Sequence, residues 1–330
     1  MKKLAVIILN WNGRKLLEQF IPTAVKHTSD DEVDLIVADN GSDDDSLTWL
    51  EKNHPEVKTI RLEKNYGFAE GYNRAIEATQ YPFTILLNSD VEVTPGWWRP
   101  LLRFLESNPD AGACQPKIRS WRDREMFEYA GGAGGMLDRL GYPYCRGRLF
   151  DSIEKDEGQY DGEPCQVAWA SGAALAVRTQ YYTALGGLDP LFFAHMEEID
   201  LCCRLTAAGH PVYAVTDSVV YHVGGASLAQ GNPQKTYLNF RNNLLLLHKN
   251  LPLRRGRKVL LLRRLADTLA FLMFLAKLDV PNARAVIRAH GDFRKMRRNY
   301  TRHPDNDILS SLPGARRMII ADRFLLRKKR

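Results

Sequence analysis

The stretch ILLNSDVEV, residues 85–93, starts as a buried strand and then departs from what a buried strand requires. A short apolar run is followed directly by the polar residues Asn88, Ser89 and Asp90. A carboxylate at the end of a core strand is costly to desolvate, and no lysine or arginine lies within four residues of Asp90 to compensate it. A divalent cation held by oxygen ligands would supply the missing positive charge. A solvated aspartate at a strand end is the alternative.

Short apolar runs of this kind recur through the first half of the chain, and segments with helical spacing separate them. The runs are LAVIIL at 4–9, VDLIVA at 33–38, VKTIRL at 57–62 and FTILL at 83–87. Strands that alternate with helices imply right-handed crossovers. We therefore expect the α/β class, with a mainly parallel sheet and helices on both faces.

Polar side chains follow each of the four predicted strands. In an open α/β sheet, ligands bind beyond the carboxyl ends of the strands. The residues at these ends are Asn10 and Asn12, then Asp39, then Asn65, and last the Asn88-Ser89-Asp90 group. An ordinary turn or a helix N-cap explains any one of them, but four at one edge of a sheet favour a binding site.

The second half of the predicted domain has fewer clear patterns. Residues 114–168 are rich in glycine and aromatic residues, and we expect them to form irregular loops over the sheet. Residues 167–177 and 212–223 look like further strands, and the spacing from Glu197 to Ala208 predicts a helix that Gly209 ends.

Three carboxylates gather at the start of that helix. Asp200 can pair with Arg204 one turn later, which gives it a structural role. Glu197 and Glu198 have no such explanation, and on a helix they point about 100° apart, so one of them can face a cleft. His222 ends the last predicted strand, where a neutral imidazole could bind a metal, although a lone histidine is more often structural.

Composition and charge set wider limits. The chain has 330 residues, 45% of them hydrophobic, which suits a globular protein. Its five cysteines show no metal-binding or disulfide pattern, so we expect reduced thiols and a cytoplasmic location. Residues 251–330 hold 21 lysines and arginines against six aspartates, whereas the whole chain has a net charge of only +7. A basic appendage therefore follows an acidic body.

The basic appendage contains an apolar segment, residues 259–278, which Arg263, Arg264 and Asp267 interrupt. Its uninterrupted part is too short for a membrane span of about 20 residues. Two interpretations stay open: helices that lie on an anionic membrane surface at the inner face of the cytoplasmic membrane, or a helical pair packed on the preceding domain. Nucleic acid is not expected as a partner, because no aromatic residues interleave with the charges.

Seven segments taken in order resemble the family 2 glycosyltransferases, which are inverting enzymes of the GT-A fold, and within them the bacterial rhamnosyltransferase-like group. The segments are ILNWNG, VADNGSDDDS, NYGFAEGYN, LLNSDVEV, WASGAALAV, GGLDPLFFAHMEEIDLCCRL and VVYHVGGAS. The resemblance covers about residues 3–250. It implies a catalytic domain over residues 1–250 and a basic helical extension over residues 251–330.

The resemblance also implies roles for individual residues. The nucleotide site would consist of Asn10, Asn12, Asp39, Asn65, Asn73 and Asn88. Asp90 and His222 would hold Mn²⁺ or Mg²⁺, with Asn88 in place of the first aspartate of the D-x-D motif of the family. Glu198 occupies the position of the catalytic base, where the family normally has aspartate, and Glu197 is the other candidate. Trp169, Gly172 and Glu197 would line the pocket for the acceptor and the donor sugar.

We therefore expect a metal-dependent, inverting transfer of sugar from a UDP- or dTDP-sugar to a hydroxyl group of a cell-envelope glycan or a lipid-linked saccharide. A sugar-phosphate nucleotidyltransferase is one alternative, but the first strand lacks the glycine-rich loop of those enzymes. A catalytically inactive glycan-binding or scaffold relative is the other.

Overall fold

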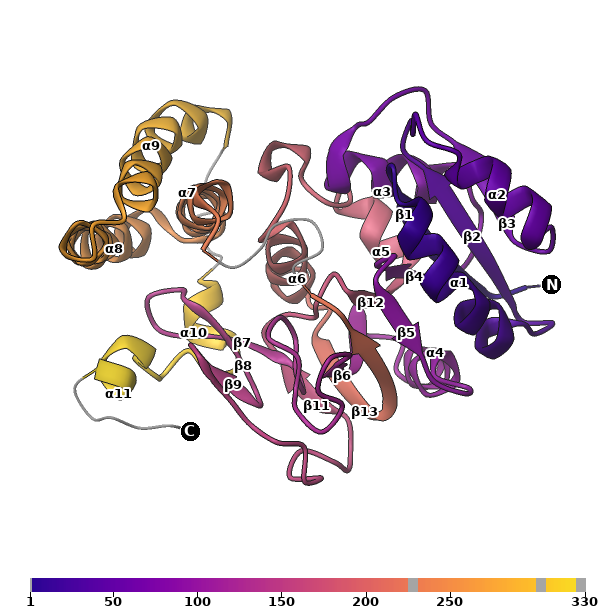
Figure 1. Ribbon diagram of the computed structural model, residues 1–330. Coiled ribbons are helices and arrows are strands. Elements are labelled where there is room, and N and C mark those ends of the chain that lie inside the picture. Colours follow the sequence, from indigo (N-terminus) through magenta and orange to yellow (C-terminus); the bar gives the residue numbers. More distant parts are fainter. Residues whose placement is uncertain (1, 225–230, 301–306, 325–330) are drawn as a thin grey trace.

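A central β-sheet organises the protein (Figure 1). The computed structural model describes residues 2–224, 231–300 and 307–324, and within them this sheet has nine strands in the order β11-β13-β6-β12-β4-β1-β2-β3, with β5 paired to β13. The strands are β1 (Leu4–Asn10), β2 (Val33–Asp39), β3 (Lys58–Arg61), β4 (Phe83–Leu87), β5 (Val91–Val93), β6 (Ala113–Ser120), β11 (Cys165–Val167), β12 (Ala174–Arg178) and β13 (Val212–His222).

The direction of the strands brings the predicted site residues to one edge of the sheet. β1 runs parallel to both β2 and β4, and β2 runs parallel to β3. β12 is antiparallel to both β4 and β6, and β13 is parallel to β6, so β13 points in the same direction as β4. The carboxyl ends of β1, β2, β4 and β13 therefore share one edge, as the sequence predicts.

Both faces of the sheet are covered by helices because successive side chains of each strand point to opposite faces. On β1, Leu4, Val6 and Ile8 pack with α1 (Arg14–Thr28), α2 (Ser46–Asn53) and α4 (Trp98–Ser107). The alternate residues Ala5 and Ile7 belong to a second core with α3 (Gly67–Glu77), α5 (Thr179–Ala184) and α6 (Glu197–Ala207). The predicted α/β class is confirmed.

The expectation of irregular loops over residues 114–168 was wrong in two places. Residues 113–120 form β6, a strand in the middle of the main sheet. A second, four-stranded antiparallel sheet has the order β10-β9-β8-β7. It consists of β7 (Gly135–Leu137), β8 (Pro143–Cys145), β9 (Arg148–Leu149) and β10 (Ser152–Ile153). The single strand expected over 167–177 is also two strands, β11 and β12.

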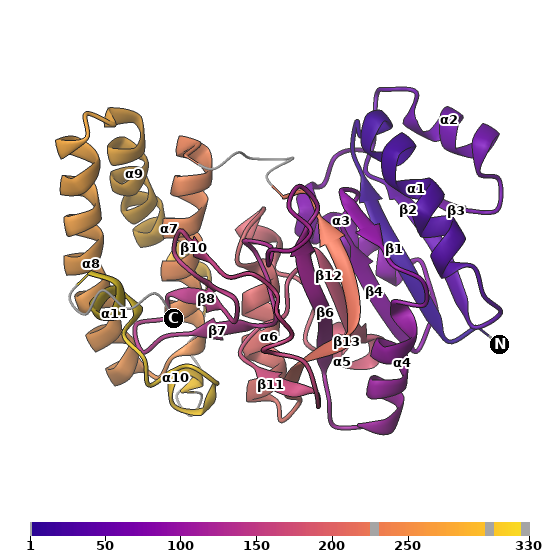
Figure 2. The same ribbon diagram turned by 60° about the horizontal axis from the view of Figure 1, so that its bottom comes forward.

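Helices follow β13 to the end of the described chain. They are α7 (Pro233–Asn250), α8 (Leu253–Ala276), α9 (Val280–Met296), α10 (Ile308–Ser311) and α11 (Ile319–Phe324). Figures 1 and 2 show α7, α8 and α9 grouped beside α6, on the side away from β2 and β3. Leu244 and Leu247 of α7 and Phe293 of α9 join the same apolar core as α6. Among the described residues, no helix has the length and apolar character needed to span a membrane.

The structure does not describe residues 225–230, 301–306 and 325–330. The last part of the predicted VVYHVGGAS motif and two parts of the basic extension lie outside the described residues.

Candidate active site

Asn10 and Asp39 form the centre of a polar cluster at the shared edge of the sheet. They face each other in the register of β1 and β2, and the Asn10 Nδ2 donates to Asp39 Oδ1 at 2.9 Å. Asp39 also accepts hydrogen bonds from the backbone N–H (3.0 Å) and the hydroxyl (2.6 Å) of Ser42. These bonds satisfy the buried carboxylate and hold it in a single orientation.

The neighbouring loops are held by asparagine side chains. Asn12 Oδ1 accepts from the backbone N–H of Asp43 at 2.8 Å, so it fixes the loop after β2. Asn40, which the sequence did not single out, donates from Nδ2 to Asn65 Oδ1 at 3.1 Å and to the carbonyl of Gly67 at 3.0 Å. The structure thus brings Asn10, Asn12, Asp39 and Asn65 together around one pair of loops.

His222 and Asp90 meet beside the ends of β4 and β13. The Nε2 of His222 lies 3.1 Å from Asp90 Oδ1, and its Nδ1 lies 3.6 Å from Glu128 Oε2. All three side chains are buried. Glu128 was not predicted, because it lies in a region where the sequence showed no pattern.

The charges in this group stabilise each other. Burial acts to lower the pKa of His222, but the hydrogen bond to Asp90 and the nearby carboxylate of Glu128 raise it to about 10. Burial acts to raise the pKa of Asp90, yet the hydrogen bond and charge of His222 bring it below its ordinary value. Burial lowers the pKa of Lys235 at the start of α7, and the negative charge of Glu128 acts in the opposite direction.

The Asp90–His222 pair fits a divalent cation that is also bound by phosphate oxygens only when the imidazole has lost its proton, because a histidine ligand must be neutral. Mn²⁺ accepts carboxylate oxygen and imidazole nitrogen, and Mg²⁺ sites often use one or two carboxylates with substrate phosphates. Among the described residues, no cluster of three or more histidine, cysteine, aspartate or glutamate side chains could hold a metal ion by itself. A cation held here would therefore need ligands from the substrate or from water.

Glu197 and Glu198 start α6, directly after Met196 in the left-handed conformation. Glu197 is buried and Glu198 is half-buried, and one carboxylate oxygen of each, Oε2, is buried without a hydrogen-bond partner among the described residues. Burial raises the pKa of Glu198 to about 7. Burial and the charge of Glu198 raise the pKa of Glu197 well above its ordinary value. Such perturbed carboxyl groups are typical of catalytic sites.

Gly172 leaves space beside Glu198. A Cβ atom placed at Gly172 would lie 3.8 Å from the Cβ of Glu198 and 3.6 Å from the ring of Phe68. The next residue, Ala173, accepts a hydrogen bond from the backbone N–H of Asn88 at 3.0 Å, so Glu198 and the Asn88–Asp90 segment lie at the same edge of the sheet.

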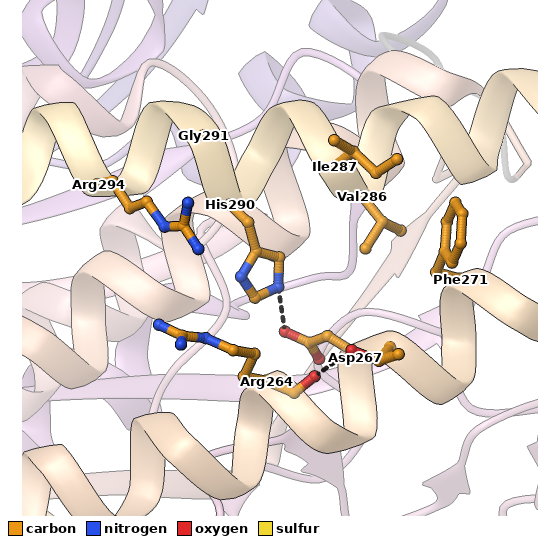
Figure 3. Close-up of a pocket in the computed structure, with 9 residues that line it drawn as sticks. Arg264, Asp267, Phe271, Val286, Ile287, His290, Gly291 and Arg294 are labelled. Atoms are coloured by element: carbon orange, nitrogen blue, oxygen red, sulfur yellow. Dashed lines mark hydrogen bonds and ion pairs between the residues drawn. The ribbon is translucent and has the colours of Figure 1, made fainter.

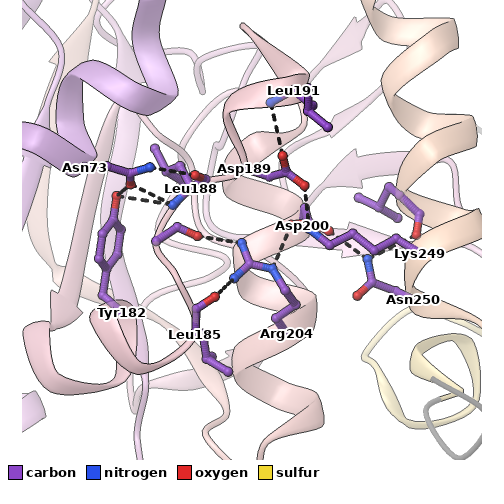
Figure 4. Close-up of polar contacts among 12 residues, drawn as sticks. Asn73, Tyr182, Leu185, Leu188, Asp189, Leu191, Asp200, Arg204, Lys249 and Asn250 are labelled. Atoms are coloured by element: carbon purple, nitrogen blue, oxygen red, sulfur yellow. Dashed lines mark hydrogen bonds and ion pairs between the residues drawn. The ribbon is translucent and has the colours of Figure 1, made fainter. Parts of the chain in front are cut away.

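Trp169 and Asn73 make structural contacts. The Trp169 ring packs directly on Gly135, and its Nε1 donates to the carbonyl of Met136 at 2.9 Å. Asn73 donates to the carbonyl of Leu188 at 2.8 Å and accepts from the Tyr182 hydroxyl at 2.6 Å (Figure 4). In the described structure, neither side chain hydrogen-bonds to Asn10 or Asp39.

The loop before Glu197 is held in an unusual conformation. Phe193, His195 and Met196 all have positive φ angles, of 66°, 67° and 74°. Such strain costs about 1–3 kcal/mol per residue and persists only where the surroundings enforce it. Asn242 on α7 supplies part of that support, because its Nδ2 donates to the carbonyls of residues 192, 194 and 195 at 2.7–2.9 Å.

Asp200, one turn into α6, links this helix to α7 through a group of polar contacts (Figure 4). It is fully buried and pairs with Arg204 and Lys249, each at 2.8 Å, and accepts from Asn250 at 2.8 Å. Arg204 also donates to the carbonyls of Leu185 and Gly187, both at 2.7 Å. The predicted Asp200–Arg204 pair is confirmed, whereas the contributions of α7 were not predicted.

Known proteins resemble this chain in sequence and in fold. Residues 5–132 match the family model of glycosyl transferase family 2. An N-acetylglucosaminyl-diphospho-decaprenol L-rhamnosyltransferase of Mycobacterium tuberculosis is 28% identical over 236 residues, which cover 66% of this chain and 76% of that protein.

Two solved structures with bound nucleotide and Mn²⁺ share the fold. The mannosyltransferase PcManGT from Pyrobaculum calidifontis, in complex with GDP-Man and Mn²⁺, has a TM-score of 0.54 at 13% identity, with 88% of this chain and 87% of that chain covered. GalNAc-T7 with UDP, GalNAc and Mn²⁺ has a TM-score of 0.59 at 18% identity, and the match covers 76% of this chain and 48% of that chain. The chain is therefore a glycosyltransferase that carries a family 2 domain and has the GT-A fold.

Proposed function

We propose that the protein transfers a sugar from a UDP- or dTDP-sugar to a hydroxyl group of a lipid-linked saccharide, with inversion at the anomeric carbon and with the help of a divalent cation. One observation carries this proposal. Among the described residues, Glu198 has a buried carboxylate oxygen without a hydrogen-bond partner, its pKa is raised to about 7, and it lies at the same sheet edge as the Asp90–His222 pair.

The polar cluster around Asp39 suits the nucleoside part of the donor. Asp39 is at the end of β2, and Asn88 and Asp90 follow β4, two strands away in the sheet. Neighbouring strands are about 4.8 Å apart, so these groups span roughly 10 Å. A nucleotide bound across the strand ends would place its base and ribose at Asp39 and its diphosphate near Asp90.

Glu198 would act as the general base. Its ionised carboxylate accepts the proton of the acceptor hydroxyl while that oxygen forms a bond to the anomeric carbon and the bond from this carbon to the diphosphate oxygen breaks. A positioned base typically contributes about 10²–10⁴-fold to the rate. A single displacement without an enzyme nucleophile inverts the configuration at the anomeric carbon.

Asp90 and His222 would hold the cation. When bound, Mn²⁺ or Mg²⁺ would supply Lewis-acid stabilisation to the negative charge of the leaving diphosphate. Without the cation, His222 at 3.1 Å supplies the positive charge beside the buried Asp90. With the cation bound, the imidazole would have to give up its proton, and the metal would take over as the positive partner of Asp90.

The acceptor is inferred from the Mycobacterium tuberculosis relative, whose name states a lipid-linked acceptor, N-acetylglucosaminyl-diphospho-decaprenol. We extend this class of acceptor to the present protein as part of the proposal. Donor and acceptor can then be tested separately.

The test is a thermal-shift panel of UDP-, dTDP- and GDP-sugars, each with and without Mn²⁺, followed by a transfer assay with the donor that binds. A ligand at a concentration of 100 Kd stabilises the folded protein by about 2.7 kcal/mol. We expect stabilisation by a UDP- or dTDP-sugar that increases with Mn²⁺, and release of the nucleoside diphosphate when an acceptor is added. Binding without any transfer or hydrolysis would instead indicate an inactive relative.

A further inference from the structure

The outer face of α8 is apolar although it is exposed. Leu261, Leu265, Leu269 and Leu272 recur at the spacing of one helix face, and their exposed fractions are 58%, 63%, 57% and 52%. Leu262, Met273 and Leu275 beside them are also exposed. Such a continuous apolar surface is unusual on a protein that has only water as its neighbour.

The inner face of the same helix is charged. Arg263 and Asp267 are only 2% and 1% exposed and lie 3.5 Å apart. Asp267 also accepts from the Tyr142 hydroxyl at 3.3 Å and lies 3.0 Å from the Nε2 of His290. This is the opposite of a usual surface helix, because α8 has an ion pair on the side that faces the protein and leucines on the side that faces the surroundings.

Basic side chains surround the leucine face. Residues 253–299 contain thirteen lysines and arginines against three aspartates, of which Asp267 is buried. Lys258 and Arg254 are exposed about one and two turns, respectively, before Leu261 on the same face of α8. A second copy of this chain would bring the same positive charge to the interface, so self-association through this face is disfavoured.

A groove between α8 and α9 combines both properties (Figure 3). Its volume is about 290 Å³. Arg264 and Arg294 reach into it from the two helices, while Phe271, Val286 and Ile287 line its apolar part. In the described residues, neither arginine forms an ion pair with an acidic side chain. Asp267 and His290 also line the groove, and the Asp267 carboxylate is paired with Arg263 and with His290. The groove thus offers the two guanidinium groups of Arg264 and Arg294 next to an apolar wall.

We propose that this surface, formed by the α8 leucines and the α8–α9 groove, docks on a bilayer that contains anionic phospholipid. The leucines enter the boundary between head groups and acyl chains, and a lipid phosphate binds between Arg264 and Arg294. Each basic side chain close to an anionic surface contributes about 1 kcal/mol to binding. The inference rests on the surface itself, and it stands independently of the proposed sugar transfer.

The experiment is sedimentation of the full chain with vesicles of phosphatidylglycerol and phosphatidylcholine, compared with vesicles of phosphatidylcholine alone. We expect binding to the anionic vesicles that weakens as salt is raised. The triple variant Leu265→Gln/Leu269→Gln/Leu272→Gln should lose this binding. The double variant Arg264→Gln/Arg294→Gln should bind roughly tenfold or more weakly.

Matched controls test whether binding depends on this surface or on any exposed positive charge or apolar side chain of the protein. Lys15→Gln/Lys26→Gln removes two exposed positive charges from α1, and Ile153→Gln removes an exposed apolar side chain from β10. Both should bind as the unmodified chain does. Because the substituted side chains are exposed, circular dichroism should show unchanged folding in every variant.

Three results would overturn the proposal. The first is no binding of the unmodified chain to anionic vesicles. The second is unchanged binding by the leucine or the arginine variant. The third is a dimer in analytical ultracentrifugation that the leucine variant converts to a monomer, since that would assign the face to a second copy. A transfer assay with a soluble acceptor, unaffected by the leucine variant, distinguishes failure of this inference from failure of the proposed function.

Discussion

The imidazole of His222 lies 3.1 Å from the carboxylate of Asp90, although 132 residues separate them in the chain. The contact follows from the sheet, because β5 directly after Asp90 pairs with β13 and His222 lies opposite Val91. Two residues with no sequence relationship therefore form one buried unit. Its position at the edge that also carries Asp39 is the reason that we propose it as the site of the diphosphate and its cation.

Asp90→Asn should remove the dependence of donor binding on Mn²⁺. The amide cannot supply the negative charge that a cation needs, so the increase in Tm that Mn²⁺ adds to a UDP- or dTDP-sugar should disappear. The measurement is a thermal shift with EDTA or Mn²⁺. Asp31→Asn, at an exposed position, is the control and should behave as the unmodified protein. A full Mn²⁺ effect in Asp90→Asn would rule out this cation site.

Glu198→Gln should abolish most transfer while it leaves donor affinity unchanged. The amide has the same size but cannot accept the hydroxyl proton, so kcat should fall by about 10²–10⁴-fold. Isothermal titration of the donor and a transfer assay give the two values. Glu197→Gln is the matched comparison, and if that variant were inactive while Glu198→Gln kept its activity, the roles of the two residues would be exchanged.

The raised pKa of Glu198 predicts opposite effects of pH on activity and on stability. The base acts when ionised, so kcat should rise with pH through about 7 and then level off. Between about 4.5 and 7 the folded chain holds a proton that the unfolded chain has lost, so the free energy of unfolding falls as pH rises. Glu198→Gln should therefore raise Tm at pH 8, by the equivalent of up to about 3 kcal/mol, and have little effect at pH 4. Equal Tm values at pH 8 would contradict the shift.

Two glycine variants should behave differently. At Gly172 an added methyl group meets Phe68 and Glu198 at ordinary contact distances, so Gly172→Ala should fold normally but raise KM for the acceptor by narrowing the space beside the base. A normal KM in Gly172→Ala would place the acceptor elsewhere.

At Gly135 an added methyl group would lie 2.1 Å from the ring of Trp169. Gly135→Ala should therefore lower the free energy of unfolding by about 1–3 kcal/mol or more, measured by urea unfolding.

Asn242→Ala should release the loop that precedes Glu197. It removes one donor from each of three carbonyl groups, of which that of Phe192 keeps Arg241 and the backbone N–H of Ala194 as donors. A buried carbonyl left without a donor costs about 1–3 kcal/mol of stability. We expect lower kcat with donor affinity within about twofold, because the residues around Asp39 are untouched. Asn53→Ala is the control, because among the described residues its exposed side chain hydrogen-bonds to the carbonyl of Trp49 in its own helix. Unchanged kcat in Asn242→Ala would show that the loop keeps its shape without this support.

The first four strands were predictable because their apolar runs are short and regularly spaced. β6 was not, because its sequence ACQPKIRS contains a proline and two basic residues. The structure accommodates Lys117 at a 4% exposed position through an ion pair with Asp156 at 3.0 Å. Since Asp156 is 39 residues away in the chain, no local pattern could reveal that this lysine belongs to the core.

In the candidate site, too, some residues could be predicted from the sequence and others could not. The polar residues at the strand ends were found because parallel strands end at a common edge. Asn40, Glu128 and Asn242 were missed because they act through backbone groups or through other side chains of the site. Asn242 donates only to carbonyl oxygens, which every residue has, so the identity of its partners leaves no trace in the sequence.

The partners of Asp200 determine how much of the polypeptide can work alone. The family match ends at residue 132, yet Lys249 and Asn250 at the far end of α7 neutralise and hydrogen-bond this buried carboxylate. A truncated or chimeric protein that stops before α7 would lack Lys249 and Asn250. The buried carboxylate of Asp200, in the same turn of α6 as Glu197 and Glu198, would then lose two of its polar partners. We therefore propose that any transplant of the sugar-transferring unit must carry α7 with it. Because Val259, Phe293 and Leu309 belong to the same apolar core as α6, the transplant must also carry α8, α9 and α10.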